Sequence, residues 1–267
     1  MRLVTFTHGG SKPEAGLVRH NQVFGLGCDM ISICSSGKVP DAAGSGQDLA
    51  SVQLLAPIPR PAKVICVGLN YRDHAAESRS EIPTVPTIFN KFPNVVIGPG
   101  APIVLPRVSR KPDYEAEFTF VIGRGGRHIP AERAMEHVFG YTIINDVSAR
   151  DFQTATTQWL MGKTFDTFCP MGPWIVTADE LDGRNIDVRL WVNGEKRQDA
   201  NTKDFIFDIP KMIETLSAGI TVYPGDVIAT GTPVGVGIGF KPPKYLKPGD
   251  VVRLEIDGIG VLENRVR

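Results

Sequence analysis

The sequence K-P-D-Y-E-A-E-F-T-F-V-I-G at residues 111–123, followed after a charged connection by G-Y-T-I-I-N-D at residues 140–146, is the part of the chain on which the fold and the site depend. Both segments are rich in apolar and β-branched residues, which predicts two buried strands. Glu115 and Glu117 lie two residues apart, so a strand places both carboxylates on one face, roughly 6.6 Å apart along the chain. Asp146 closes the second strand.

Three carboxylates at the ends of buried strands repel one another unless a positive charge lies between them. A hard divalent cation such as Mg²⁺ meets that requirement, because it prefers oxygen ligands and keeps open positions for a substrate. The alternative is a solvated strand face on which Glu115 and Glu117 lie in water. The spacing alone leaves these two interpretations equally open.

The composition is that of an ordinary globular protein. The chain has 267 residues, of which 42% are hydrophobic, and Lys+Arg and Asp+Glu number 29 each. No basic run and no membrane-length apolar stretch occurs, so we expect no nucleic-acid partner and no membrane partner. The first residues lack the apolar core of a signal peptide. The cysteines match neither a C-x-x-C motif nor a disulfide framework, which predicts reduced thiols and a cytoplasmic protein. They are Cys28, Cys34, Cys66 and Cys169.

Two domains are expected. The alternating prolines of residues 56–61 predict an extended linker, which separates a small N-terminal β-rich domain at residues 1–57 from a larger domain at residues 58–267. The small domain is predicted to hold a strand at 3–7, a hairpin of 15–19 and 23–26, and a weakly patterned segment at 31–48.

The larger domain is predicted to be mainly β. A strand is expected at 64–68, a hairpin turn at Asn193-Gly194, and Pro-Gly turns at 224–225 and 248–249 that each launch a strand. Short helices are predicted at 131–137, 151–160 and 209–216. The fold class is therefore α+β, mainly β, with a sandwich or rolled sheet and three or four short helices packed outside.

A candidate lid follows the strand at 64–68. Asp73 can cap a short helix in which His74 and Glu77, three residues apart, share one face. The polar, proline-bearing segment 78–86 is predicted to be mobile. The alternative, a surface histidine with a charge partner, is the better interpretation of these residues taken alone.

Two glycine motifs do not predict nucleotide binding. Gly162-Lys163-Thr164 resembles the end of a phosphate loop, but Thr157 stands where that motif needs glycine. Gly235–Gly239 alternates glycines without opening a helix, which excludes a dinucleotide site. No G-x-S-x-G elbow is present, so a serine nucleophile of that type has no candidate.

Five ordered motifs make residues 64–266 resemble the fumarylacetoacetate hydrolase family. They are V-G-L-N-Y at 67–71 with His74 and Glu77, D-Y-E-A-E at 113–117, N-D-V-S-A-R-D-F-Q at 145–153, G-K-T-F-D-T-F-C-P at 162–170, and Y-P-G-D-V-I-A-T-G-T-P at 223–233. With F-K-P-P at 240–243, the pattern looks most like the short branch of acylpyruvases and oxaloacetate tautomerases. The resemblance makes the metal site and the lid the preferred interpretations.

The resemblance implies a fold, a metal ion and roles for nine residues. The fold is a rolled mixed β-sandwich catalytic domain with a small N-terminal domain, in a homodimer. Mg²⁺ or Mn²⁺ would bind Glu115, Glu117 and Asp146. Lys163 would face the substrate, and Arg150, Gln153 and Thr232 would help to hold its carboxylate and keto oxygens. His74 and Glu77 would be the lid dyad.

The same resemblance implies a small anionic 2-keto acid as substrate. The first expectation is Mg²⁺-dependent hydrolysis of the C–C bond of a 2,4-diketo acid, of acylpyruvate or fumarylpyruvate type, through a metal-bound enolate. Glu77 would orient His74, His74 would take a proton from water, and Lys163 would help to protonate the leaving enolate. Three alternatives share the enolate: oxaloacetate keto–enol tautomerisation, isomerisation of a 2-hydroxy-diene-dioate, and oxaloacetate decarboxylation. A non-catalytic metal-binding paralogue is less favoured, because the residues that only chemistry requires are intact.

Overall fold

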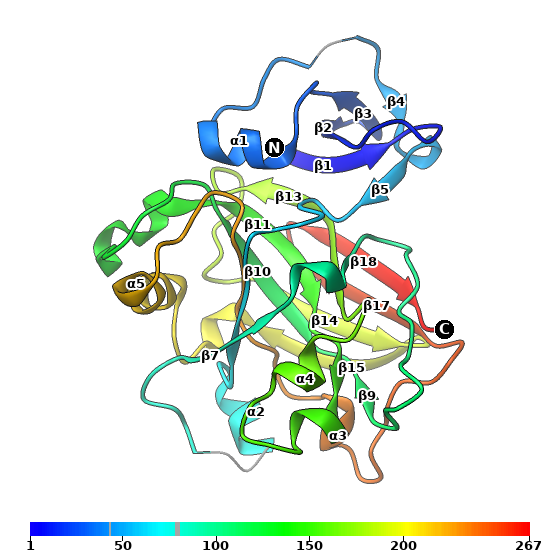
Figure 1. The fold of residues 1–267 in the computed structure, drawn as a ribbon, viewed down its shortest axis with the longest axis vertical. Helices are drawn as coiled ribbons and strands as arrows, with labels where there is room; N and C mark the ends of the chain where they lie inside the picture. Colours follow the sequence, from blue (N-terminus) through cyan, green and yellow to red (C-terminus); the bar gives the residue numbers. More distant parts are fainter. Residues whose placement is uncertain (43, 78–80) are drawn as a thin grey trace.

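The computed structural model describes residues 1–42, 44–77 and 81–267 and shows a mainly-β molecule with short helices at its margins (Figure 1). Most strands belong to one large mixed sheet with the order β4-β3-β2-β1-β13-β11-β10-β16-β6-β7, and the expected fold class is confirmed. The strands of this sheet are β1 Arg2–Thr7, β2 Glu14–Arg19, β3 Gln22–Gly25, β4 Gln47–Asp48, β5 Gln53–Leu55, β6 Val64–Gly68, β7 Thr87–Lys91, β8 Val96–Ile97, β10 Ala116–Ile122, β11 Val138–Asn145, β13 Cys169–Thr177 and β16 Val227–Ala229.

β10 and β11 form the centre of this sheet. Every residue of β10 is buried, because the apolar run has protein on both faces. β10 pairs antiparallel with β11 in a register that sets Ala116 opposite Asn145. The backbone N–H of Asp146 therefore donates to the carbonyl of Glu115 at 2.9 Å. The predicted carboxylates meet where the first of these strands begins and the second ends.

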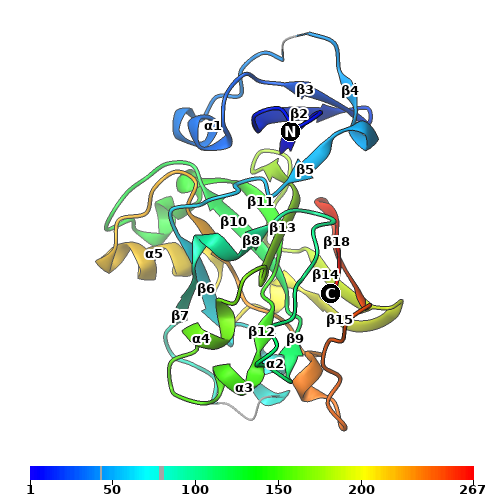
Figure 2. The same cartoon turned by 45° about the vertical axis from the view of Figure 1, so that its right-hand side comes forward.

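A second sheet, with the order β15-β14-β17-β18, packs on the large sheet, and the core lies between the two (Figure 2). Phe118 and Phe120 of β10 belong to the same buried cluster as Leu190, Leu254 and Leu262 of the second sheet. Burial of these apolar side chains between the two sheets is the main stabilising contribution in this part of the molecule. The strands are β14 Asp187–Val192, β15 Glu195–Asn201, β17 Val251–Ile256 and β18 Gly260–Arg265.

The predicted turns are confirmed. Asn193 and Gly194 have φ values of 51° and 79°, as a two-residue hairpin of type I′ requires. Gly225 and Gly249, which follow the two prolines, have φ values of 84° and 93°. These values fit the third position of a type II turn, which an ordinary L-residue rarely adopts.

Two of the predicted helices are present with changes. α5 spans Ile209–Gly219 and begins at Asp208, whose side chain accepts the N–H of Lys211 at 2.8 Å. Such a cap satisfies one of the backbone donors that a helix leaves unpaired at its start. The segment Ala131–His137 is a 3₁₀ helix preceded by Pro130.

The helix predicted over residues 151–160 is wrong. The structure has two four-residue helices instead, α3 Arg150–Gln153 and α4 Leu160–Lys163, with turns between them. The hydroxyl of Thr156 donates to the carbonyl of Gln158 and accepts its N–H, both at 3.1 Å. Threonine side chains that bond the backbone in this way compete with helix formation.

The N-terminal strands continue the large sheet. β1 pairs antiparallel with β13, with Arg2 opposite Val176. Leu3 and Leu17 belong to the same buried cluster as Val121 of β10. The domain boundary after residue 57 stays a prediction, and both the sheet and this cluster are continuous across it.

A helix that the sequence analysis did not predict overlaps the weakly patterned N-terminal segment 31–48. α1 spans Met30–Ser36. Asp29 caps it by accepting the N–H of Ser32 at 2.9 Å, and Gly37 ends it in the left-handed conformation, with φ 64°. Capping by Asp and Gly therefore explains a helix whose interior contains serines with little helix preference.

The helices α2, α3 and α4 gather at the end of the molecule opposite to the N-terminal strands, in both views (Figures 1 and 2). Close to them lies a two-stranded ladder of β9 Pro112–Asp113 and β12 Ser148–Ala149. α2 spans Arg72–Glu77, so His74 and Glu77 lie on a helix as predicted. Of the segment expected to be mobile, residues 78–80 lie outside the described residues, and residues 81–86 form neither helix nor strand. Within the described ranges, no helix has the length and apolar character needed to cross a membrane.

Candidate active site

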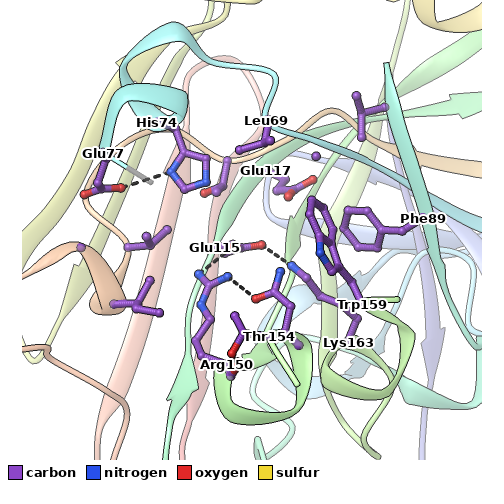
Figure 3. Close-up of a pocket in the computed structure, with 17 residues that line it drawn as sticks. Leu69, His74, Glu77, Phe89, Glu115, Glu117, Arg150, Thr154, Trp159 and Lys163 are labelled. Atoms are coloured by element: carbon purple, nitrogen blue, oxygen red, sulfur yellow. Dashed lines mark hydrogen bonds and ion pairs between the residues drawn. The ribbon is translucent and has the colours of Figure 1, made fainter. Parts of the chain in front are cut away.

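A cavity of about 390 Å³ lies between α2, α3, α4 and the start of β10 (Figure 3). Eight of the nine site residues predicted from the sequence line it: His74, Glu77, Glu115, Glu117, Arg150, Gln153, Lys163 and Thr232. The ninth, Asp146, is fully buried beside the two glutamates. Residues separated by more than 150 positions in the sequence thus meet at one place.

The three carboxylates form a compact buried group. Glu115, Glu117 and Asp146 each offer an oxygen, and these oxygens lie within 4.8 Å of one another. Burial, together with the two neighbouring carboxylates, raises the pKa of Glu117 well above its usual range. A proton or a cation is therefore needed to offset the charge of this group. Clustered carboxylate oxygens without thiol or imidazole donors are the ligands that Mg²⁺ and Mn²⁺ prefer, so the residues fit a hard divalent ion.

Lys163 lies beside two of these carboxylates. Its Nζ is 2.6 Å from Glu115 Oε2 and 2.6 Å from Asp146 Oδ2. Burial alone would lower the pKa of Lys163, but the two carboxylates raise this pKa above its ordinary value. Burial alone would raise the pKa of Glu115, but the positive charges of Arg150 and Lys163 lower it to about 2. The lysine is therefore a charged ammonium group that faces the cavity.

Lys91 is a site residue that the sequence reasoning missed. It ends β7, its side chain is 0% exposed, and its Nζ donates to Asp146 Oδ1 and, at 3.0 Å, to the carbonyl of Val147. Asp146 is therefore held between two lysines, Lys91 on one oxygen and Lys163 on the other. The signal in the sequence was weak: a single lysine at the end of a short strand of mixed polar and apolar residues.

Arg150 connects the carboxylate group to a fourth buried acid. Its Nε donates to Asp113 Oδ2 at 2.8 Å, its Nη1 donates to Gln153 Oε1 at 2.8 Å, and its Nη2 lies 2.7 Å from Glu115 Oε1. The contact with Glu115 is a close ion pair but is not aligned as a hydrogen bond. Asp113 is fully buried. The family motif contains Asp113, but the sequence reasoning gave it no role.

The charges of the buried site nearly cancel. Asp113, Glu115, Glu117 and Asp146 are four acids, and Lys91, Arg150 and Lys163 are three bases, so the acids exceed the bases by one. A divalent cation would reverse the sign of this small excess. The resulting positive site suits a small anion such as a keto acid.

Two polar side chains in the cavity wall can donate to an anion. Thr232 Oγ1 accepts the amide N–H of Gln198 at 2.8 Å, which leaves its own hydroxyl proton to point elsewhere. The oxygen of the Gln153 amide accepts from Arg150, so its NH₂ group has two donors to offer. Both residues therefore suit the carboxylate- and keto-binding roles expected of them.

The predicted dyad of His74 and Glu77 is formed at the side of the cavity (Figure 3). His74 Nδ1 lies 3.1 Å from Glu77 Oε2, and Glu77 Oε1 accepts the N–H of Gly235 at 3.0 Å. His74 is nearly buried and lines the cavity. A carboxylate on Nδ1 orients the imidazole ring and favours the tautomer that is protonated on this nitrogen.

An apolar wall limits the size of the cavity. The rings of Phe89 and Trp159 meet edge to face, with centroids 5.4 Å apart. A Cβ atom on Gly68 would lie only 2.5 Å from the Trp159 ring, so glycine is what lets that ring pack here. Lys163 Nζ lies 4.9 Å from the centroid of Phe89, close enough for a cation–π contact.

Known proteins resemble this chain over most of its length. A family model described as fumarylacetoacetate (FAA) hydrolase, C-terminal, matches residues 63–267. A mitochondrial oxaloacetate tautomerase of Xenopus laevis is 50% identical over 220 residues, which are 81% of this chain and 69% of the relative. An oxaloacetate tautomerase of Bacillus subtilis is 49% identical over 223 residues, which are 82% of this chain and 74% of the relative. A solved maleylpyruvate hydrolase from Sphingobium sp. SYK-6, in complex with manganese(II) ion and pyruvate, has a TM-score of 0.83 and 34% identity, and the match covers 100% of this chain and 98% of that one.

Proposed function

The chain belongs to the fumarylacetoacetate hydrolase family and is an enzyme, and from that premise we propose that it is an oxaloacetate tautomerase. The observation that carries the proposal is the identity of about one residue in two with proteins named for that activity. It favours the keto–enol alternative over C–C bond hydrolysis, which the motifs had put first. The cavity supports it, because a small site that a divalent cation would make positive suits a four-carbon keto diacid.

Glu115, Glu117 and Asp146 would hold the metal ion, which we propose to be Mg²⁺ or Mn²⁺. When bound, the ion supplies Lewis acidity that favours the enol form of a neighbouring keto group. Arg150, Gln153 and Thr232 lie around the same cavity and donate hydrogen bonds to the carboxylate and keto oxygens of the substrate. Holding these oxygens fixes the plane in which the proton must be added or removed.

Lys163 moves the proton in the proposed reaction. From the enol, its ammonium gives a proton to C3 of the substrate, and the amine so formed takes the proton that the enol hydroxyl loses. The lysine ends in its starting state and one C–H bond has replaced one O–H bond. The neighbouring carboxylates, which raise the pKa of Lys163, make recovery of the proton favourable.

Hydrolysis of a 2,4-diketo acid is the second candidate, and the geometry of the dyad favours it. Glu77 holds His74 at 3.1 Å, and His74 faces the cavity, where it can take a proton from water. The likeness to a maleylpyruvate hydrolase is in keeping with this reading. Isomerisation of a diene-dioate and decarboxylation of oxaloacetate use the same enol and remain lesser alternatives.

One comparison of variants separates the two reactions. Enol–keto exchange of oxaloacetate and cleavage of an acylpyruvate are followed in the ultraviolet at saturating Mg²⁺, in wild type, His74→Ala and Lys163→Ala. Loss of a general base typically lowers the rate by about 10²–10⁴-fold. We expect rapid exchange in the wild type, a small loss in His74→Ala and a loss of that size in Lys163→Ala. His8→Ala, at an exposed histidine, is the matched control.

The proposal is wrong if the wild type cleaves acylpyruvates and does not accelerate exchange of oxaloacetate. A large loss of exchange in His74→Ala would instead transfer the proton-moving role from Lys163 to His74.

We also propose a homodimer in the cytoplasm, with no nucleic-acid or membrane partner. Four free cysteines support a reducing compartment. Light scattering of the purified protein tests the dimer, because a mass near 29.0 kDa would show a monomer.

A further inference from the structure

The loop Gly235–Gly239 contacts two parts of the site. On one side, the N–H of Gly235 donates to Glu77 Oε1 at 3.0 Å. On the other side, the N–H groups of Gly237 and Ile238 donate to the two oxygens of Asp113 at 2.7 and 3.0 Å. The alternating glycines that did not predict a dinucleotide site therefore join the lid helix α2 to a buried acid.

Each glycine of the loop is required by a close approach. A Cβ at residue 235, where φ is +103°, would lie 1.9 Å from the carbonyl oxygen of Arg197. A Cβ at residue 237 would lie 2.5 Å from Asp113 Oδ1, and one at residue 239 would lie 2.2 Å from Glu77 Oε1. Two of the three glycines thus bring the backbone against the two carboxylates that the loop connects.

Asp113 receives four hydrogen bonds. Its Oδ1 accepts from the N–H groups of Tyr114 and Gly237, and its Oδ2 accepts from the N–H of Ile238 and from Arg150 Nε. The carboxylate does not line the cavity, whereas Arg150 does. Asp113 therefore does not contact a bound anion itself, and its hydrogen bonds reach the anion through Arg150 and the loop.

We propose that Asp113 is a positioning residue, and that it couples an anion bound at Arg150 to the position of the His74–Glu77 pair through the Gly235–Gly239 loop. The inference rests on the proposed function for the identity of that anion. The side chains of Val236 and Ile238 line the cavity, so the loop also meets the substrate directly. A short loop held at both ends by hydrogen bonds moves as a unit, so a shift of Arg150 is passed to Glu77. Such coupling is reciprocal and typically amounts to about 5–150-fold in affinity.

The test measures hydrogen exchange in α2, with oxalate and Mg²⁺ as the probe. In the wild type, oxalate should slow exchange of the amides of residues 73–77 by about tenfold. In Asp113→Asn, one amide nitrogen faces two donors whichever way it is turned, so two of the four hydrogen bonds are lost. The slowing should then fall to about twofold or less, while Mg²⁺ affinity by calorimetry stays within about threefold. The KM for oxaloacetate should rise about tenfold with a smaller fall in kcat, because Arg150 is misplaced.

Asp151→Asn is the matched control. Asp151 is a neighbouring aspartate that accepts from Ser109 Oγ and the N–H of Arg110, away from the cavity. The Asp151→Asn variant should keep the oxalate-dependent protection of α2. Retained protection in Asp113→Asn, equal loss in both variants, or no protection by oxalate in the wild type would each overturn the inference.

A second, milder variant covers the case in which Asp113→Asn does not fold. The hydroxyl of Tyr114 donates to the carbonyl of Gly235 at 3.1 Å, and Tyr114 does not line the cavity. Tyr114→Phe should speed exchange in α2 and weaken oxalate binding, each by about fivefold, whereas Tyr141→Phe should do neither. Unchanged oxalate affinity in Tyr114→Phe would refute the coupling. Because these readouts use oxalate, a wild type without tautomerase activity would refute the proposed function and leave the coupling intact.

Discussion

Replacement of Lys91 by methionine tests whether this lysine is a permanent counter-ion of the carboxylates that we propose as metal ligands. Methionine keeps the length of the side chain and removes the charge and the donors. Lys91 is buried, and its Nζ bonds Asp146 and the carbonyl of Val147. Removal of one partner of a buried ion pair costs about 3–5 kcal/mol. We expect a loss of that size in the free energy of unfolding when EDTA keeps the site free of metal.

A bound divalent ion should offset part of this loss. Lys91→Met increases the excess negative charge of the site from one to two, so Mg²⁺ should bind at least about tenfold more tightly, which is about 1.4 kcal/mol. The destabilisation measured by urea unfolding should therefore be smaller by about that amount in saturating Mg²⁺ than in EDTA.

A second lysine–aspartate pair provides the control. Lys63 Nζ lies 2.7 Å from Asp226 Oδ2, and its side chain is 28% exposed. Neither residue lines the cavity, so the effect of Lys63→Met on stability should be the same with and without Mg²⁺. The reasoning about Lys91 is refuted if its variant loses less than about 1 kcal/mol in EDTA, or if Mg²⁺ leaves the loss unchanged.

Three further outcomes follow from the site and the core. Glu117→Gln should weaken Mg²⁺ binding about 100-fold by calorimetry and leave stability in EDTA unchanged or higher, because a neutral amide replaces a buried acid and still accepts the N–H of Gly231. Trp159→Ala should raise kcat/KM for bulky acylpyruvates relative to oxaloacetate about tenfold in a steady-state assay, because it removes the apolar wall. Iodoacetamide at pH 8 should label Cys28 first by mass spectrometry, since burial raises the pKa of Cys34 and Cys169 to about 12 and little thiolate forms. Equal labelling of Cys28, Cys34 and Cys169 in the native protein would contradict that order.

The carboxylate group could be predicted from the sequence because short-range rules determine it. The two-residue period of a strand places Glu115 and Glu117 on one face, and an antiparallel neighbour brings Asp146 beside them. The Asn193-Gly194 turn was equally predictable, since its backbone angles demand those residue types.

Other features depend on contacts that the sequence does not display. Lys91 meets a partner 55 residues away, and Asp113 meets Gly237 at a separation of 124 residues. Neither has a local pattern that distinguishes it from a surface charge or a turn residue. The helix wrongly predicted at 151–160 failed for a local reason, because threonine hydroxyls bond the backbone there. The role of the alternating glycines became visible only once Glu77 and Asp113 were seen against them.

The pairing of β1 with β13 joins two strands that are made at very different times during synthesis of the chain. Arg2 pairs with Val176, so the ribosome must add 174 residues after Arg2 before this partner exists. At 5–20 residues per second, this takes roughly 9–35 s. During that time β1 can pair with β2 on one edge and, at Thr5–Thr7, with β5 on the other, but the edge at Arg2 and Leu3 stays open until β13 is made. This short edge of β1 therefore stays uncovered during much of the synthesis of the sheet, so it is a place where a wrong strand can bind.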